Sequence, residues 1–320
     1  MTAAAARAHT DSGDGGRSGP PERINAIPLP HRVRTVVAAA LLVGVVLFLY
    51  GAATNEAYSW DTYRQYLFDP RVVQAAGNTV LLTILSMILG IGLGVVLAVM
   101  RLTPNPVTRT VSWVYIWIFR GTPVYVQLVF WGLLSTIYPR IDLGVPFIQP
   151  LMSIPTSTFA ENVFWLAVVG LGLNEAAYMA EIARAGIQSV DEGQTEAATA
   201  LGLSSAQSLR LVVLPQAMRA IIPPTGNEVI SMLKTTSLVT AVPYTFDLYS
   251  RTRDLAVETF NPVPMLLIAS TWYLFFTSIL MVGQVFLERR FARGSSRIMS
   301  DRQLQALADA ERPPTGRAAS

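Results

Sequence analysis

The sequence predicts an all-α integral membrane protein with about six transmembrane helices. Three observations predict this fold class: 52% of the 320 residues are hydrophobic, only 14% are charged, and the apolar residues gather in long uninterrupted runs. Soluble domains carry roughly a quarter charged residues. The composition therefore excludes an ordinary soluble protein.

The residue types that are missing exclude several kinds of chemistry. The chain has no cysteine, so it has no disulfide, thiolate nucleophile or cysteine-bound metal. Its two histidines, His9 and His31, both lie in the polar N-terminal tail, away from any buried site. We therefore expect no catalytic residue, no metal site and no cofactor bound by this chain. The chain has a single lysine, Lys234, and it lies within an apolar stretch.

Six apolar runs are candidates for membrane spans, because a bilayer core of about 30 Å needs about 20 apolar residues as helix. The first run starts late and lacks a small-x-small cleavage pattern, so it is interpreted as a retained helix rather than a signal peptide. The third run is longer than a span requires and contains Arg120. The runs cover residues 35–53, 78–100, 111–137, 162–184, 224–246 and 264–287.

The distribution of arginine predicts that both chain ends are cytoplasmic. With the N-terminus inside, the inner segments hold five arginines in the first tail, two and three in the two loops, and seven in the last tail, against five outside. Cytoplasmic loops carry the excess of basic residues in membrane proteins. Arg289, Arg290 and Arg293 directly follow the last run, so the bias holds when distant tail residues are discounted.

A helical hairpin is predicted between the fourth and fifth runs, on the cytoplasmic side. Residues 195–201 are good helix formers, and Gly202 is expected to end this helix in a left-handed conformation. Ser204 and Gln207 have the spacing of a capping box, which predicts the start of a second helix. We expect Pro215 to end or kink that second helix.

The spacing within this hairpin resembles the cytoplasmic loop of permeases of ATP-binding-cassette (ABC) importers. The matching positions are Glu196-Ala197-Ala198, Gly202, Val212 and Leu214-Pro215. Further segments resemble the polar amino acid branch of that superfamily, and the resemblance covers about residues 75–287. These segments are Asn78-Thr79, Phe119 to Pro123 with Gln127, Gly172 to Ile187, Gly193-Gln194, Leu214 to Ala217, Pro223, Asn227 and Lys234 to Leu238.

The resemblance implies a type I ABC importer permease fold and a domain organisation. Family members typically have five spans with an external N-terminus, so the first helix and an insert at residues 138–161 are departures. We expect the insert to form an extracytoplasmic lid or docking surface. The expected parts are a disordered cytoplasmic tail (1–33), an extra helix with an extracytoplasmic segment (34–74), a permease core (75–287) with a coupling loop (186–222), and a disordered basic tail (288–320).

The resemblance also implies the function and the partners. The chain is expected to be the permease subunit of a binding-protein-dependent importer of polar amino acids in the bacterial cytoplasmic membrane. It contains no phosphate-binding Gly-x-x-x-x-Gly-Lys-Ser/Thr loop, so two separate subunits must hydrolyse ATP. A second permease, identical or related, and an extracytoplasmic solute-binding protein complete the assembly, which lies in the lipid bilayer and needs no nucleic acid.

By resemblance, the hairpin transmits the movement of the ATPase. Gly202 allows the bend, residues 203–207 insert into a groove of the ATPase, and Glu196 and Arg210 supply polar contacts. The residues assigned to this coupling are Glu196, Ala197, Ala198, Gly202, Leu203, Ser204, Ser205, Gln207, Arg210 and Pro215.

Charged residues within the spans indicate the substrate pathway, because a charge at mid-bilayer is costly and usually faces a cavity. Glu175 and Lys234 both fall near the midplane by position in their runs. Glu175 is suited to accept the ammonium of an amino acid, and Lys234, with Thr236 and Ser237, to bind its carboxylate. The other residues assigned to the pathway are Asn174, Tyr178 and Arg120.

Several alternatives remain open at this level. Glu175 and Lys234 form either a substrate site or a structural ion pair, and Lys234 alone is also interpretable as a scaffold residue. Glu181 and Arg184 are interpreted as an interfacial pair or gate. The glycines at 90, 92 and 94 favour close helix packing over ligand contact. Alternative solutes are an opine, an osmolyte or cystine, and a channel is disfavoured because no filter or charge ring is visible.

Overall fold

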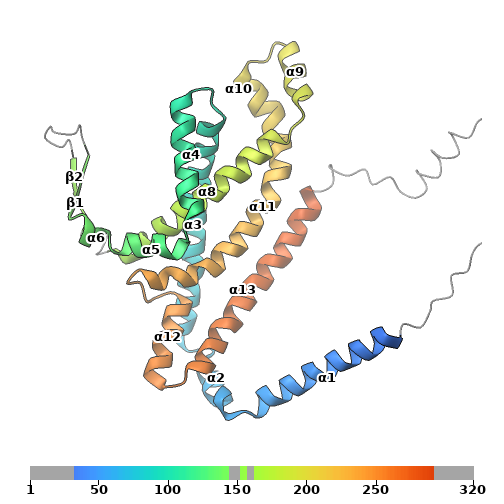
Figure 1. The fold of residues 1–320 in the computed structure, drawn as a ribbon, viewed down its shortest axis with the longest axis vertical. Helices are drawn as coiled ribbons and strands as arrows, with labels where there is room; N and C mark the ends of the chain where they lie inside the picture. Colours follow the sequence, from blue (N-terminus) through green and yellow to red (C-terminus); the bar gives the residue numbers. More distant parts are fainter. Residues whose placement is uncertain (1–31, 144–151, 157–161, 292–320) are drawn as a thin grey trace, which may run out of the picture. The chain divides into compact units, whose positions relative to one another are not determined.

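The structure, a computed structural model, describes residues 32–143, 152–156 and 162–291 (Figure 1). The chain divides into two compact units, residues 1–55 and 56–320. The first unit contains α1 (Arg32–Thr54), a helix that is apolar after its first turn and whose large apolar side chains are exposed. The tails expected at 1–33 and 288–320 lie largely outside the described residues, so their predicted disorder stays a prediction.

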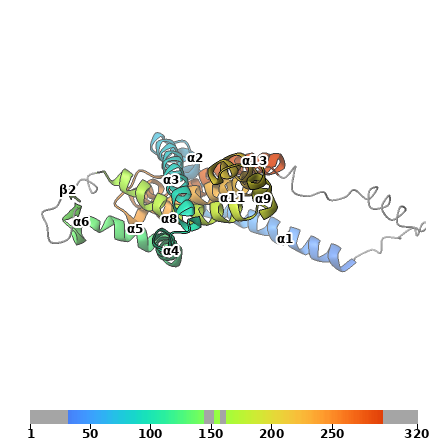
Figure 2. The ribbon, with the colours of Figure 1, turned by 90° about the horizontal axis from the view of Figure 1, so that it is seen from above.

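The second unit is built from helices that connect two ends of the fold (Figures 1 and 2). One end carries the hairpin of α9 and α10, and the opposite end carries α2 and α12. The elements are η1 (Glu56–Tyr58), α2 (Trp60–Tyr66), α3 (Pro70–Leu102), α4 (Pro106–Gly121), α5 (Val124–Gly132), α6 (Leu134–Ile137), β1 (Arg140–Leu143), β2 (Met152–Pro155), α8 (Val163–Gln188), α9 (Glu192–Ala200), α10 (Ser205–Ser208), η2 (Leu209–Val213), α11 (Leu214–Thr235), η3 (Thr236–Ala241), α12 (Leu248–Thr259) and α13 (Pro262–Phe291).

Helices α3 and α8 form the most extensive pairing of the unit. Two glycines of α3 allow it: a Cβ at Gly90 would lie 2.7 Å from the Glu175 Cγ, and one at Gly94 would lie 2.6 Å from the Met179 Cβ. The predicted packing role is therefore confirmed for these two. It is wrong for Gly92, where a Cβ would meet nothing within 4 Å, because this residue points away from α8.

Four helices among the described residues are long and apolar enough to cross a membrane: Val33–Thr54, Pro70–Leu102, Val163–Gln188 and Pro262–Phe291. They correspond to the first, second, fourth and sixth predicted runs. The second run begins earlier than expected, because Asp69 accepts a hydrogen bond from the Arg71 backbone N–H and caps α3. Asn78 and Thr79 consequently lie inside α3 rather than at its start.

The third run, 111–137, was expected as one span but is broken into α4, α5 and α6. The break lies at Thr122, whose backbone is extended (φ −120°, ψ 145°), immediately before Pro123. A residue that precedes proline is sterically pushed out of the helical region, and proline then suits the start of the next helix.

The fifth run also differs from its expected form. Helix α11 begins at Leu214, well before residue 224, and helical structure continues through Pro215. The expectation that Pro215 ends the second helix is therefore wrong, and its alternative, a kink at this proline, stays a prediction. The π-helical turn η2 directly precedes this proline, and its wider spacing accommodates a ring that would clash with the preceding turn of an α-helix. Helical structure ends with the tighter turns of η3, Thr236–Ala241.

The segment between α6 and α8, predicted as an insert, forms a short antiparallel hairpin of β1 and β2 in its described part. Arg140 pairs with Pro155 and Leu143 with Met152. Residues 144–151 and 157–161 lie outside the described residues.

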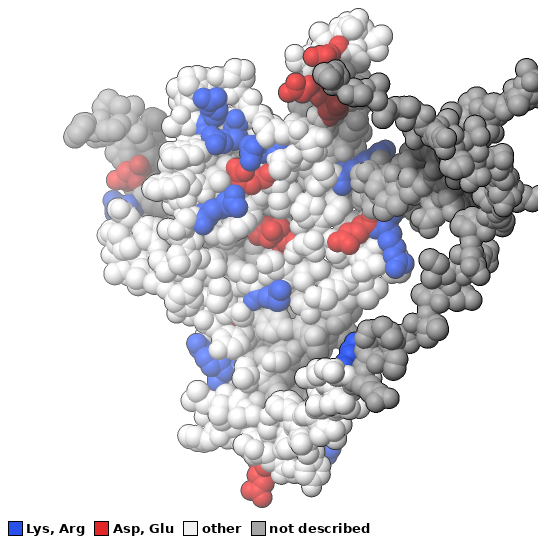
Figure 3. Space-filling view, turned by 45° about the vertical axis from the view of Figure 1, so that its right-hand side comes forward, with Lys and Arg blue, Asp and Glu red and all other residues white. Residues whose placement is uncertain are grey.

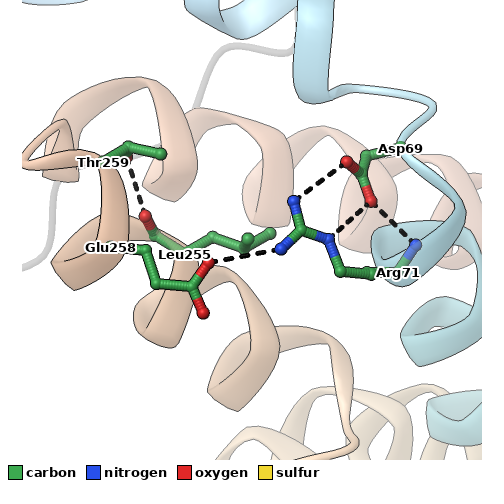
Figure 4. Close-up of polar contacts among 5 residues, drawn as sticks. All are labelled: Asp69, Arg71, Leu255, Glu258 and Thr259. Atoms are coloured by element: carbon green, nitrogen blue, oxygen red, sulfur yellow. Dashed lines mark hydrogen bonds and ion pairs between the residues drawn. The ribbon is translucent and has the colours of Figure 1, made fainter.

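An ion network joins α3 to α12 at the end of the unit opposite the hairpin (Figure 4). The Arg71 guanidinium donates to both carboxylate oxygens of Asp69, at 3.1 and 3.2 Å, and to Glu258 of α12 at 3.2 Å. Arg71 holds the pKa of the Asp69 carboxyl below its usual range. Elsewhere charges are sparse, and Figure 3 shows them separated by broad uncharged areas, as expected for a chain that contacts lipid.

Candidate functional site

The hairpin of α9 and α10 is shaped by two local motifs, both of which the sequence predicts correctly. Gly202 has φ +78°, and the backbone N–H groups of Gly202 and Leu203 donate to the carbonyls of Thr199 and Ala198. These two bonds make a Schellman motif, which closes α9. The Ser204 hydroxyl and the Gln207 side chain then cap the following helix reciprocally, as a capping box.

The surface of the hairpin combines exposed apolar and polar side chains. Leu201 is 82% exposed and Leu211 is 62% exposed, which leaves two leucines uncovered at the tip and along η2. Glu196, Ala197 and Arg210 are also exposed. Ala198 differs, because it is buried inside the hairpin. The hairpin thus presents an uncovered apolar surface with polar groups around it, which is typical of a protein contact.

Two cavities lie between α4, α8 and α11. The cavity nearer the hairpin, here the proximal cavity, has a volume of about 490 Å³, and Glu181, Ala185, Ala220 and Pro224 are among its lining residues. The cavity farther from the hairpin, the distal cavity, has a volume of about 520 Å³, and Asn174, Glu175, Ser231 and Thr235 are among its lining residues. Three residues line both cavities: Arg120, Tyr178 and Glu228.

The break between α4 and α5 places Arg120 at these cavities, and a buried amide network fixes the break. The Gln127 Nε2 donates to the backbone oxygens of Phe119 and Thr122, at 2.9 and 3.1 Å, and to the Thr122 hydroxyl at 2.8 Å. Asn174 of α8 donates to the Phe119 carbonyl at 3.1 Å and to the Gln127 side chain at 3.0 Å. Since all donors are used, the network holds the end of α4 against α8.

The charged residues that line the cavities are three carboxylates, Glu175, Glu181 and Glu228, and one guanidinium, that of Arg120. Glu175 is only 4% exposed, and its Oε1 has no hydrogen-bond partner among the described residues. The Arg120 guanidinium lies 5.3 Å from the centre of the Tyr178 ring, a cation–π distance. Glu181 is neutralised by Arg184, whose Nη2 lies 2.6 Å from its carboxylate. Among the described residues, the Glu175 Oε1 is therefore the carboxylate oxygen at these cavities that is buried without a hydrogen-bond partner.

The structure separates the predicted pathway residues into two groups. Arg120, Asn174, Glu175 and Tyr178 line the distal cavity. The second group, Lys234, Thr236 and Ser237, lines neither described cavity.

The alternative of a Glu175–Lys234 ion pair is wrong for the described part of this chain. Glu175 is buried against α3, whereas Lys234 is exposed on the other side of α11 from the core. Thr236 and Ser237 donate to backbone carbonyls of their own segment, at 2.6 and 2.7 Å. These hydroxyls complete the end of α11. The sequence places residues along a span, but it does not fix the rotation of the helix, and rotation decides which residues meet.

Glu228 is the residue that the sequence reasoning missed. It is a carboxylate inside the fifth predicted run, the same criterion that selected Glu175 and Lys234. Its spacing to Ser231 and Thr235, three and seven residues on, places all three on one face of α11, and all three line the distal cavity. This periodicity was the available signal.

Comparisons with known proteins agree with this architecture. Residues 90–293 match the family of binding-protein-dependent transport system inner membrane components. The chain is 57% identical over 301 residues to the arginine transport system permease protein ArgU of Corynebacterium glutamicum, covering 94% of this chain and 93% of the relative. It is 34% identical over 226 residues to the arginine transport system permease protein ArtQ of Bacillus subtilis, covering 69% and 92%.

A solved structure shares the fold. The chain superposes on a crystal structure of an amino acid ABC transporter with histidines, with a TM-score of 0.57, 32% identity, and coverage of 70% of this chain and 95% of that one. Methionine transporter MetNI chains in inward-facing conformations share the fold at 16% identity and a TM-score of 0.53. The predicted type I permease fold is confirmed. This chain belongs to the family of binding-protein-dependent transport system inner membrane components, and is a multi-pass permease subunit of an ABC importer.

Proposed function

We propose that this chain carries cationic amino acids across the bacterial cytoplasmic membrane through the distal and proximal cavities. The observation that carries this proposal is the charge at the distal cavity: two carboxylates, Glu175 and Glu228, and one guanidinium, Arg120. A dibasic amino acid carries two positive groups and one carboxylate, which is the complementary set. Two relatives named above are arginine permeases, in agreement with this class.

Each charge has a separate task in this proposal. Arg120 binds the α-carboxylate, because a guanidinium forms strong paired hydrogen bonds with a carboxylate. Glu175 and Glu228 bind the α-ammonium and the side-chain cation. The uncommitted Oε1 of Glu175 is available for such a bond. Asn174 positions the Arg120 segment through Phe119.

The energy for transport enters through the hairpin. We propose that two separate ATPase subunits bind the surface formed by Leu201, Glu196 and Arg210, and that residues 203–207 enter a groove of the ATPase. Both termini then lie in the cytoplasm, and the β1–β2 hairpin faces the solute-binding protein outside. A second permease, identical or related, covers the exposed face of α11, where Lys234 would otherwise face lipid at a cost of about 2.5–3.5 kcal/mol.

Transport by the reconstituted complex tests the substrate class. The complete transporter, with its ATPase subunits and solute-binding protein, is placed in proteoliposomes, and ATP-driven uptake of arginine is compared with that of citrulline. Citrulline has nearly the same shape but an uncharged side chain. We expect Glu228→Gln and Glu175→Gln each to lower the arginine-to-citrulline uptake ratio at least tenfold, measured at concentrations that saturate the binding protein.

The matched control is Glu258→Gln. It removes a carboxylate from the ion network with Arg71, at the end of the unit opposite the hairpin, and leaves the cavities intact. This variant is expected to keep the uptake ratio of the original protein. An unchanged ratio in both cavity variants refutes the cationic class, and uptake of neutral amino acids or cystine in preference to arginine does the same.

A further inference from the structure

The two cavities follow one another along a pair of antiparallel helices. On α8 the lining residues run from Glu175, through Tyr178, to Glu181 and Ala185, moving from the distal to the proximal cavity. On α11 they run in the opposite chain direction, from Thr235 and Ser231, through Glu228, to Ala220. The two cavities therefore form one path, and it is divided at the level of Tyr178 and Glu228.

The groups at this division come from three elements, and two of them, Arg120 and Tyr178, are in contact. Arg120, at the end of α4, extends over the Tyr178 ring of α8. Glu228 of α11 lines the same two cavities and is close enough to Arg120 to interact with it electrostatically. Since these three residues line both cavities, their side chains are what separates one volume from the other. The amide network of Gln127 and Asn174 holds the Arg120 backbone in place, so only the long side chain is free to move.

We infer that the Arg120–Tyr178 contact is a gate within the translocation path. This inference rests on the proposed function, since it assigns the path to transport. A substrate carboxylate that enters the distal cavity competes with the Tyr178 ring for the guanidinium. Arg120 then leaves the ring to bind the substrate carboxylate, and the path opens toward the proximal cavity.

The absence of cysteine makes the gate directly measurable, because any introduced thiol is unique in this chain. Ser231→Cys places a thiol in the distal cavity, and Ala220→Cys places one in the proximal cavity, both on α11 and both exposed in the chain. The full transporter is reconstituted without ATP, and a charged, membrane-impermeant thiol reagent is added to either side of the membrane. The rate of labelling is measured for each thiol and each side.

With the gate intact, each thiol is expected to react from one side only, and the two from opposite sides. Tyr178→Leu removes the ring, so each thiol is expected to react from both sides, with at least a tenfold rise in rate from the previously closed side. Tyr178→Phe keeps the ring face and is the matched control, expected to keep one-sided labelling. Arg120→Gln removes the other half of the contact and is expected to open the path like Tyr178→Leu.

Two results overturn the gate. One is labelling of either thiol from both sides at equal rates while Tyr178 and Arg120 are intact. The other is one-sided labelling that persists in both Tyr178→Leu and Arg120→Gln, in complexes that retain their ATPase subunits during purification. Labelling requires no transport, so the gate and the cationic substrate class fail independently. If the arginine-to-citrulline uptake ratio is unchanged in Glu175→Gln and Glu228→Gln but the labelling is as expected, the cationic substrate class is refuted and the gate is supported.

Discussion

The left-handed turn at Gly202 gives a sharp quantitative prediction for coupling. A Cβ at this position meets nothing within 4 Å, so replacing the glycine creates no clash within the chain. The backbone, at φ +78°, is the whole source of the cost. For a residue with a Cβ, the left-handed conformation costs roughly 1–2 kcal/mol of conformational free energy. The cost is smaller for asparagine than for alanine, because the short polar side chain of asparagine can form local hydrogen bonds in this conformation.

This strain converts into an effect on ATPase binding. A free-energy change of 1–2 kcal/mol is a factor of about 5–30 in an equilibrium. If only the native hairpin binds the ATPase, affinity falls by the fraction of chains that keep that shape. The expected affinities therefore decrease from Gly202 to Gly202→Asn to Gly202→Ala, with at most about a 30-fold loss for alanine. Binding is measured by titrating the purified ATPase subunit against the permease in detergent.

Gly77→Ala is the matched control, because Gly77 lies in α3 and a Cβ there also meets nothing within 4 Å. Its expected affinity is that of the original protein. If alanine and asparagine at 202 both bind as glycine does, the left-handed turn is unnecessary. If the affinity for the ATPase falls by far more than 30-fold in both Gly202→Ala and Gly202→Asn, the added side chain clashes with the ATPase itself. The reasoning from backbone strain is then refuted.

Two further predictions concern stability, measured as the thermal midpoint of the purified transporter. Gly94→Ala is expected to lower the free energy of unfolding by about 1–3 kcal/mol, because the new Cβ lies 2.6 Å from the Met179 Cβ and forces α3 away from α8. Gly92→Ala places its Cβ in open space and is expected not to lower the thermal midpoint. Equal midpoints for the two variants contradict this prediction. Asp69→Asn keeps the helix cap but removes the charge that Arg71 binds. Because that contact lowers the pKa of Asp69, its stabilisation is full above the unfolded pKa of about 3.9 and is lost as pH falls through the lower folded pKa. The difference between the original protein and Asp69→Asn should vanish in that range, and a difference that persists there rejects the ionic contribution.

The features that the sequence predicts correctly depend on near neighbours in the chain. Gly202 and the Ser204–Gln207 pair form their motifs within a few residues, so their types and spacing suffice. The break at Thr122 also had a local signal in Pro123, but the apolar run on both sides favoured one continuous span. At Pro215 the local signal predicted an end or a kink, and the helix does not end there because a π-helical turn accommodates the ring.

The features that the sequence does not predict depend on how helices are rotated against one another. Glu175, Glu228 and Lys234 are each a charge within an apolar run, although Glu228 lies nearer the end of its run. Only packing distinguishes them: the close approach at Gly90 presses α3 against Glu175, and the same assembly turns Lys234 outward. A pair of charges was therefore expected where the fold builds a cavity with two carboxylates and one arginine.

The connectivity of the chain links the two halves of the mechanism. Helix α8 ends at Gln188 and α11 begins at Leu214, so the hairpin joins the two helices that carry Tyr178 and Glu228. Arg120 lies at the end of α4, and the amide network ties that end to α8 through Asn174. In the proposed mechanism, a movement of the hairpin that shifts α11 against α8 therefore displaces Glu228 relative to Arg120 and Tyr178. Helices are stiff, so this displacement reaches the cavities without any change in the helices themselves. Variants of Gly202 that weaken ATPase binding should consequently leave the one-sided labelling of Ser231→Cys intact in the absence of ATP, whereas Tyr178→Leu abolishes it while binding the ATPase normally.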